Sequence, residues 1–156
     1  MKIKLFIILL VFSSSVIYSQ CNGRYETQIF NSVSKTTVNY SDQIQYQDSY
    51  HEMDIYTPDS DTASNRPLII FIHGGSYLGG SKTEIDCIDF CEHFAKKGYV
   101  TASVNYRLST NQLNFVLSQE EQYSTVWKSV ADVKAAIRHF RKDYFNGNNY
   151  GIDQNT

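Results

Sequence analysis

The sequence lacks several features that would assign the protein to common classes. Its longest apolar run, residues 5–12, is too short to cross about 30 Å of hydrocarbon, which argues against a membrane span. No basic patch with interleaved aromatic residues occurs, and this disfavours nucleic-acid binding. No internal repeat is visible, and 156 residues suffice for one ordinary domain but not for two.

Cysteine is also scarce, with three residues in the chain. Cys87 and Cys91 lie four positions apart in a predicted helix, where side-chain directions fit a mutual bridge poorly. A disulfide from Cys21 to Cys87 or to Cys91 would suit an exported protein. The alternative is that Cys87 and Cys91 are small buried apolar residues. Two cysteines at this spacing are a weak signal for a metal site, and the sequence implies no metal or organic cofactor.

The first 19 residues have the pattern of a secretory signal peptide. Lys2 and Lys4 precede the apolar segment 5–12, and Ser19 is a small residue before the expected cleavage point. We therefore expect export to the periplasm or the extracellular space, with residues 20–156 forming the mature domain. Lipid attachment at Cys21 is the less favoured alternative, because Gln20 is not a small residue. Removal of the leader leaves 12 basic and 16 acidic residues, a net charge of −4.

The mature sequence alternates strand patterns with helix patterns. Residues 28–40 and 50–56 alternate like half-exposed strands, whereas 68–72 (Leu-Ile-Ile-Phe-Ile) is typical of a fully buried strand. Residues 99–106 predict a further strand. Early antiparallel strands followed by strand, helix, strand and helix predict an α/β fold. We expect a mixed, mostly parallel sheet with flanking helices and a right-handed crossover.

Two helices are predicted from capping signals and apolar spacing. Ser81 and Glu84 fit a capping box, and Gly98 fits the end of the helix that follows. Ser118 and Glu121 fit a second capping box before a longer amphipathic helix. The expected buried face of the first helix is Ile85, Ile88, Cys91 and Ala95, and that of the second is Val126, Val130, Val133, Ile137, Phe140 and Tyr144.

The predicted strand 68–72 runs directly into a glycine loop that extends to Gly80. Gly74 and Gly75 have no side chains, so their backbone N–H groups are bare at the carboxyl end of the strand. Such groups can stabilise a developing negative charge, which is the task of an oxyanion hole. The loop therefore indicates acyl-transfer chemistry.

Three motifs follow one another along the chain. They are His73-Gly74-Gly75-Ser76, Asn105-Tyr106-Arg107-Leu108 and the segment from Asp132 to Arg138. Together they resemble the amino-terminal half of an α/β-hydrolase of the carboxylesterase/lipase type. More narrowly, they are similar to secreted esterases related to feruloyl and acetylxylan esterases. The resemblance covers residues 38–153.

The resemblance implies roles for individual residues. Gly74 and Gly75 would supply the oxyanion-hole backbone, and His73 would be a structural histidine rather than the catalytic base. Support for the loop would come from His73, Ser76, Asn105, Arg107 and Asp132. The family's nucleophile lies on a Gly-x-Ser-x-Gly elbow and is followed by an acid and a histidine. The sequence contains no such elbow, so we expect the nucleophile, acid and base to be encoded beyond Thr156.

The expected function is that of a secreted carboxylic-ester hydrolase of the acyl-serine type, present as an inactive fragment. Its substrate would be a small-molecule ester or an ester linked to a polysaccharide. Truncation before the nucleophile strand would leave 68–72 as an exposed apolar edge. The alternatives are a non-catalytic hydrolase-like binding or interaction domain, or a pseudogene product. The ester and the oligomeric state are left open.

Overall fold

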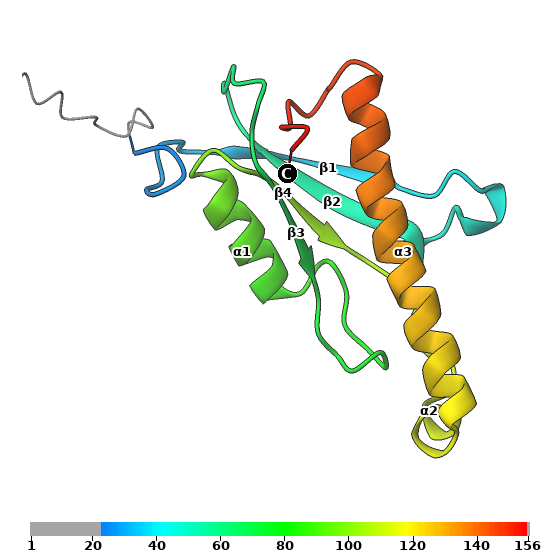
Figure 1. Ribbon diagram of the computed structural model, residues 1–156. Coiled ribbons are helices and arrows are strands. Elements are labelled where there is room, and N and C mark those ends of the chain that lie inside the picture. The colour runs from blue at the N-terminus through cyan, green and yellow to red at the C-terminus, as the bar shows by residue number, and fades with distance from the viewer. Residues whose placement is uncertain (1–22, 156) are drawn as a thin grey trace, which may run out of the picture.

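Four strands form a single sheet in the computed structural model, which describes residues 23–155 (Figure 1). The strand order is β1-β2-β4-β3, with β1 antiparallel to β2, β2 antiparallel to β4, and β3 parallel to β4. The sheet is therefore mixed, as the sequence predicts, but among residues 23–155 two of its three strand pairings are antiparallel, so this part of the sheet is not mostly parallel. The strands are β1 (Val33–Asn39), β2 (Glu52–Pro58), β3 (Leu68–Ile72) and β4 (Val100–Val104).

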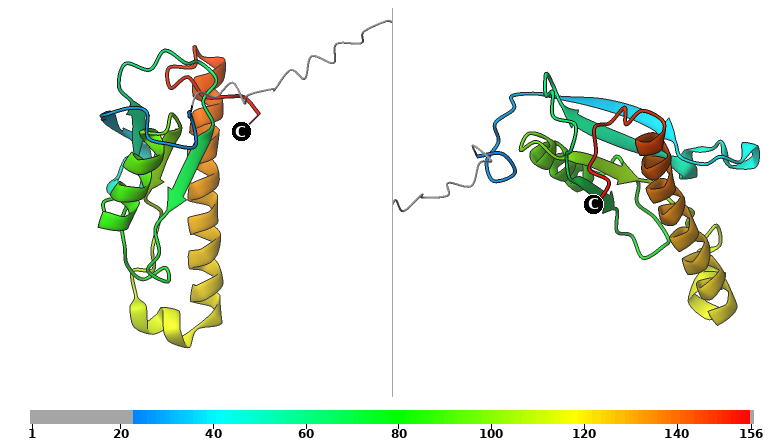
Figure 2. Two further views of the ribbon diagram at one scale, coloured as in Figure 1. Left: turned by 90° about the vertical axis from the view of Figure 1, so that its left-hand side faces the viewer. Right: turned by 45° about the horizontal axis from the view of Figure 1, so that its top comes forward.

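Helices cover both faces of this sheet. Helix α1 (Ile85–Ala95) connects β3 to β4 and packs on one face, and the long helix α3 (Gln119–Phe145) lies on the other (Figure 2). The short helix α2 (Gln112–Leu117) precedes α3, and the corner between them projects beyond the sheet (Figure 1). Two 3-10 turns, η1 (Ile44–Tyr46) and η2 (Ser49–His51), lie in the connection from β1 to β2.

The alternation of strand residues divides the core into two parts. On the α3 face, Phe140 packs with residues of β2 and β4, among them Ile55 and Ala102. On the α1 face, Cys91 and Ala95 pack against Tyr56 of β2. The core therefore lies on both sides of β2 and β4, in the middle of the sheet.

Strand β3 lies at one edge of the described sheet. Among residues 23–155, the outer side of this edge has one backbone neighbour: Arg66, two residues before the strand, forms a parallel bridge with Ile152. The Arg66 amide donates to the Gly151 carbonyl at 2.9 Å, and the Asp153 amide donates to the Arg66 carbonyl at 2.9 Å. Ile72, at the other end of β3, is 48 % exposed.

Several local predictions are confirmed and others are wrong. The strand at 68–72 has the predicted bounds, and Ser118 caps α3 by accepting from the Glu121 amide. The capping box at 81–84 is wrong, because Glu84 is the N-cap residue of α1 and the Ser81 hydroxyl bonds to Thr83. The buried face of α1 is also shifted: Cys87 is fully buried, whereas Ile85 is 77 % exposed.

The buried face of α3 is shifted in the same way. Its fully buried residues are mostly small or polar, since the helix packs its hydroxyl and carboxylate side chains against polar loop backbone near the strand ends. Of the predicted stripe, Phe140 is fully buried, and Val130 is exposed. The buried residues of α3 are Thr125, Ser129, Asp132, Ala136 and Phe140.

Two predictions concern segments outside the described residues. The signal peptide at 1–19 and the disulfide partner Cys21 both precede residue 23. Cys87 and Cys91 are buried and are not bridged to each other. Pairing of either with Cys21 stays a prediction.

Candidate functional site

The glycine loop leaves β3 in a tight and sterically crowded path. Gly75 has φ +109°, and a Cβ atom there would lie 2.1 Å from the carbonyl oxygen of Gly79. Gly80 has φ +95°, and a Cβ atom there would lie 2.5 Å from Nδ1 of His73. Both positions therefore require glycine. Gly74 differs, because no atom lies within 4 Å of a Cβ built on it.

Hydrogen bonds close the loop on itself and leave its first amides free. The Leu78 amide donates to the Gly75 carbonyl at 2.9 Å, and the Gly79 amide reaches the same oxygen at 3.3 Å. Within residues 23–155, the amides of Gly74 and Gly75 donate no hydrogen bond. In this part of the chain, two adjacent N–H groups at the carboxyl end of β3 are thus without an acceptor, and their use as an oxyanion hole stays a prediction.

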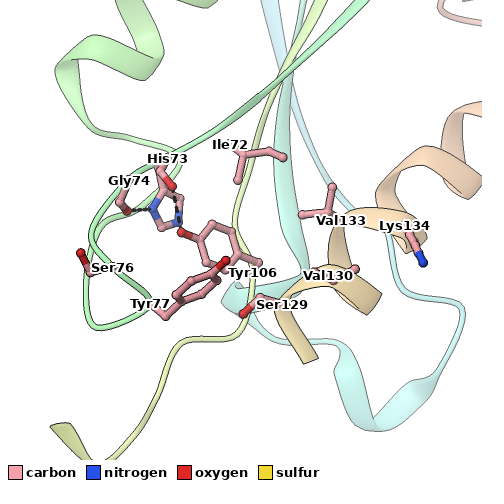
Figure 3. Close-up of a pocket in the computed structure, with 10 residues that line it drawn as sticks. All are labelled: Ile72, His73, Gly74, Ser76, Tyr77, Tyr106, Ser129, Val130, Val133 and Lys134. Carbon is pink, nitrogen blue, oxygen red and sulfur yellow. Dashed lines mark hydrogen bonds between the residues drawn. The ribbon is translucent and has the colours of Figure 1, made fainter. Parts of the chain in front are cut away.

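A cavity of about 480 Å³ lies beside this loop (Figure 3). One wall is the loop with Tyr106, and the opposite wall is the side of α3 that carries Val130 and Val133. The lining is largely apolar, which keeps the local dielectric low and strengthens hydrogen bonds to any charge that develops there. Gly74 belongs to this lining, whereas Gly75 does not.

His73 is buried and holds the start of the loop. Its Nδ1–H donates to the Gly74 carbonyl at 2.8 Å, and its ring stacks on Tyr106 with centroids 4.4 Å apart. The Tyr106 hydroxyl in turn donates to the His73 carbonyl at 2.8 Å (Figure 3). Burial raises the pKa of the Tyr106 phenol, so this group remains a proton donor at neutral pH. These contacts suit the structural role that the resemblance implies for His73.

Ser76 and Tyr77 both have left-handed backbone, with φ of +54° and +63°. Residues with side chains adopt this conformation at a cost, and it recurs at functional sites. The Tyr77 carbonyl accepts from the Ser109 amide at 2.8 Å, and its ring meets Tyr106 edge-on. The Ser76 hydroxyl makes no hydrogen bond within residues 23–155, so its supporting role stays a prediction.

Arg107 and Asp132 form a close ion pair, and neither residue lines the cavity. The Arg107 guanidinium donates to both carboxylate oxygens of Asp132, with its shortest contact at 2.7 Å, and the Arg107 amide adds a bond of 2.9 Å. This carboxylate holds the pKa of the Arg107 guanidinium above its usual value. Nε2 of His51 lies 3.4 Å from Asp132, while Nδ1 of His51 lies 2.7 Å from Asp48. Through Asp132, the cluster joins α3 to the segment that follows β4 and to the segment that precedes β2.

Asn105 links two loops that lie far apart in the sequence. Its side-chain oxygen accepts from the Lys82 amide at 2.6 Å, and its side-chain nitrogen donates to the Ser49 carbonyl at 2.7 Å. Lys82 itself reaches Asp54 on β2, with Nζ 2.7 Å from the carboxylate. The sequence does not predict that Lys82 and Asp54 form a buried pair, because a lysine in a polar loop gives no signal that it is buried.

Among residues 23–155, the other histidines and cysteines do not line this cavity. His51 falls in the segment 50–56 that the sequence predicts as a half-exposed strand, but it lies in η2 and is buried. His93 is exposed. His139 is half-buried rather than exposed, and burial lowers its pKa. Burial also raises the pKa of the Cys91 thiol to about 12, so this thiol is unreactive at neutral pH.

No helix among residues 23–155 is both long enough and apolar enough to span a bilayer. In the same part of the chain, no group of three or more histidine, cysteine or carboxylate side chains is placed to hold a metal ion.

Comparison with known proteins places these features in a family. The family model BD-FAE matches residues 53–156, which include the glycine loop, Asn105, Arg107 and Asp132. No curated protein matches. The match covers about two thirds of the chain and begins at β2.

Solved esterase structures share the fold. Esterase 2 from Thermogutta terrifontis is 26 % identical, with a TM-score of 0.52 over 76 % of this chain and 36 % of that one. A truncated carbohydrate esterase from gut microbiota is 25 % identical, with a TM-score of 0.52 over 84 % of this chain and 39 % of that one. Esterase B from Lactobacillus rhamnosis is 19 % identical, with a TM-score of 0.50 over 74 % and 31 %. The chain thus spans about a third of the length of these enzymes.

Proposed function

The chain belongs to the BD-FAE family of α/β-hydrolase esterases, and from this premise we propose that it carries the oxyanion-stabilising part of a serine ester hydrolase. Attack of a serine on an ester carbonyl places a negative charge on the carbonyl oxygen. The amides of Gly74 and Gly75 would donate to that oxygen. Loss of one such donor typically costs about 3 kcal/mol of transition-state stabilisation.

The free amides beside an apolar cavity are the observation that carries this proposal. Gly75 and Gly80 cannot carry a side chain without steric conflict, which restricts the backbone conformation of the loop. Two hydrogen bonds of 2.8 Å hold this conformation: the His73 ring donates to the Gly74 carbonyl, and the Tyr106 hydroxyl donates to the His73 carbonyl. The donors would therefore be oriented before the substrate binds, as oxyanion catalysis requires.

We propose further that the nucleophile, acid and base come from polypeptide outside these 156 residues. The sequence has no Gly-x-Ser-x-Gly elbow. Ser76 is a poor substitute, because its hydroxyl has no basic partner within residues 23–155 and Nδ1 of His73 is engaged by the Gly74 carbonyl. The share of the solved esterases that this chain spans, 31 % to 39 %, supports the same view.

The proposed substrate is an ester of a small carboxylic acid, free or linked to a polysaccharide. The related carbohydrate esterase from gut microbiota supports the polysaccharide-linked form. Export through the leader at 1–19 would bring the protein to such a substrate. Amino-terminal sequencing of the secreted protein checks the leader, and we expect the mature chain to start at Gln20.

The decisive test uses the complete reading frame that encodes this chain. We expect it to hydrolyse p-nitrophenyl acetate, and we expect the Gly74→Pro variant to lose about 10²-fold in kcat because proline has no N–H. Gly74→Ala is the matched control: it keeps the N–H, and the added Cβ meets open space. Equal losses in the two variants, with both folded by circular dichroism, would show that the amide is not an oxyanion donor.

A second test uses the 156-residue chain alone. We expect no saturable hydrolysis and no covalent labelling by a fluorophosphonate probe, since the chain supplies no activated serine. Labelling that disappears in the Ser76→Ala variant would overturn the assignment of the nucleophile to another segment.

A further inference from the structure

We propose that Lys82 is a positioning residue for the glycine loop, acting through its buried ion pair with Asp54. The inference rests on the proposed function for its catalytic consequence, because it concerns the loop that would bind the oxyanion. It assigns a role to a pair that lies on the α1 side of the sheet, away from the cavity. Neither residue touches the proposed reaction centre.

The pair is deeply buried and well formed. Asp54 is 0 % exposed and Lys82 is 8 % exposed, and Nζ of Lys82 donates to Asp54 Oδ1 at 2.7 Å. The same carboxylate oxygen accepts from the Thr37 hydroxyl at 2.7 Å. Two charged groups lie farther away, since Glu52 is 3.8 Å from Lys82 and Lys35 is 3.8 Å from Asp54. Removal of one buried partner strands the charge of the other, so the pair resists separation.

Lys82 is fixed through its backbone as well as its side chain. Its amide donates to the Asn105 side chain at 2.6 Å, and its carbonyl accepts from the Ser103 hydroxyl at 2.9 Å. Ser103 and Asn105 belong to β4 or follow it directly. Lys82, two residues after the glycine loop, is thus held by three hydrogen bonds: one to β2, one to β4 and one to the residue that follows β4.

This anchor reaches the proposed donors through Gly80. Gly80 lies two residues before Lys82, and its α-carbon faces both the His73 ring and the Gly74 carbonyl: a Cβ there would be 2.5 Å from Nδ1 and 2.6 Å from the carbonyl oxygen. A shift of residues 80–82 away from the His73 ring would remove this contact and release the peptide group between Gly74 and Gly75, which carries the Gly75 N–H. A shift toward the ring is blocked by the close approach of Gly80 to the ring and to the Gly74 carbonyl. The pair therefore sets the position of this peptide group relative to the sheet.

Hydrogen exchange on the 156-residue chain tests the anchoring without any catalytic assay. The double variant Lys82→Met, Asp54→Leu removes both charges, so no buried charge is stranded. We expect the Leu78 and Gly79 amides, which bond to the Gly75 carbonyl, to exchange about 10-fold faster or more, while the Ala102 amide in β4 is unchanged. The single variant Lys82→Arg keeps both charges of the pair, so the Leu78 and Gly79 amides should keep most of their protection.

The control removes the acidic partner of a different, partly buried ion pair far from the loop. Arg24 and Asp61 pair near the beginnings of β3 and β4, whereas the loop follows the end of β3, and Asp61→Asn should destabilise the fold without selective exchange at Leu78 or Gly79. If the loop and Ala102 amides accelerate equally in the double variant, or if the loop amides do not accelerate, the positioning role is wrong.

The catalytic arm uses the complete reading frame. We expect the double variant to lose about 10- to 10²-fold in kcat on p-nitrophenyl acetate with KM within about 2-fold, because a small misplacement of catalytic groups has such an effect. Unchanged kcat in an active protein would overturn the positioning role. Absence of activity in the unmodified complete protein would instead defeat the proposed function, and the exchange result would still decide whether Lys82 anchors the loop.

Discussion

Strands β3 and β4 are parallel neighbours of equal length, yet their environments are opposite. Leu68, Ile70 and Ile72 of β3 are in register with Val100, Ala102 and Val104 of β4. The three β4 residues are 0 % exposed. The β3 residues are larger and more apolar, but none is fully buried.

The difference comes from topology rather than from composition. Strand β4 has a strand on each side and a helix on each face, so every side chain has neighbours. Strand β3 has β4 on one side; on the other, the part of the chain that the structure describes supplies only the bridge between Arg66 and Ile152, just before the strand. Exposure is greatest at Ile72, where the strand enters the glycine loop and the cavity. The open part of β3 therefore coincides with the proposed site.

This comparison indicates how the domain divides its tasks. The centre of the sheet, β2 and β4, carries the two cores and the anchors of the glycine loop. The edge at β3 presents the loop and the cavity and adds less to stability. Apolar surface left at such an edge is normally covered or used in binding, because exposed strand edges promote association.

The largest expected effect contrasts a register pair. Val104→Ala removes two fully buried methyl groups and should lower the free energy of unfolding by about 2 kcal/mol, since it adds a cavity to the lost apolar burial. Ile72→Ala, across the same β3–β4 pairing, should cost less than about 1 kcal/mol because the side chain is already 48 % exposed. Urea unfolding monitored by circular dichroism measures both.

Equal costs would contradict the difference in burial between β3 and β4. They would mean that Ile72 is buried in solution by another polypeptide or by a second copy of the chain. Repeating the measurement at a tenfold lower protein concentration separates these cases, because burial by association weakens on dilution.

A medium effect is expected at the covered beginning of β3. Asp61 pairs with Arg24 and lies 3.6 Å from Arg66, the residue that precedes the strand by two positions. Burial acts to raise the pKa of the Asp61 carboxyl, but the hydrogen bond from Arg24 and the nearby positive charges outweigh burial, and the pKa is lowered overall. The carboxylate therefore stabilises the fold above its unfolded-state pKa of about 4 and loses this contribution as the pH falls through the lower folded-state pKa.

Asp61→Asn removes that pH dependence. The variant should be less stable than the original at pH 7, and the gap should close as the pH is lowered from about 5 to 3. Unfolding curves at several pH values measure the gap. A gap that stays constant with pH would show that Asp61 acts by packing and neutral hydrogen bonds rather than by its charge.

Much of the fold could be predicted because the relevant signals are local. The apolar run at 68–72 ends where the structure ends β3, and the Ser118 cap begins α3. The motif that contains Gly74 and Gly75 led to the loop whose two amides are free. In each case, a short stretch of sequence carries the signal for the local structure, although distant residues such as Tyr106 and Lys82 also hold the glycine loop in place.

The wrong predictions concern side chains whose burial depends on contacts with residues that are distant in the sequence. Ile85 was expected to be buried, but α1 turns Cys87 and Cys91 toward the sheet and leaves Ile85 in solvent. His51 belongs to the segment 50–56 predicted as a half-exposed strand, but it lies in η2, and the carboxylates of Asp48 and Asp132 flank its buried ring. Periodicity identifies an apolar face, but it does not identify which polar groups pair across the fold.

The smallest expected effect on stability, and the most informative one about the edge, comes from adding a charge to β3. Ile72→Lys places a long charged side chain at the open end of the strand, where about half of the side chain is already in solvent. Unfolding free energy should change by less than about 1 kcal/mol, whereas self-association of the chain should fall because a lysine on an edge strand blocks edge-to-edge pairing. Sedimentation velocity at increasing concentration measures the association.

The matched control is Ile85→Lys, which alters an exposed isoleucine of α1 that lies away from any strand edge. If both variants reduce association equally, general surface hydrophobicity is responsible; if Ile72→Lys alone does so, the uncovered edge of β3 is the surface that distinguishes it from β4.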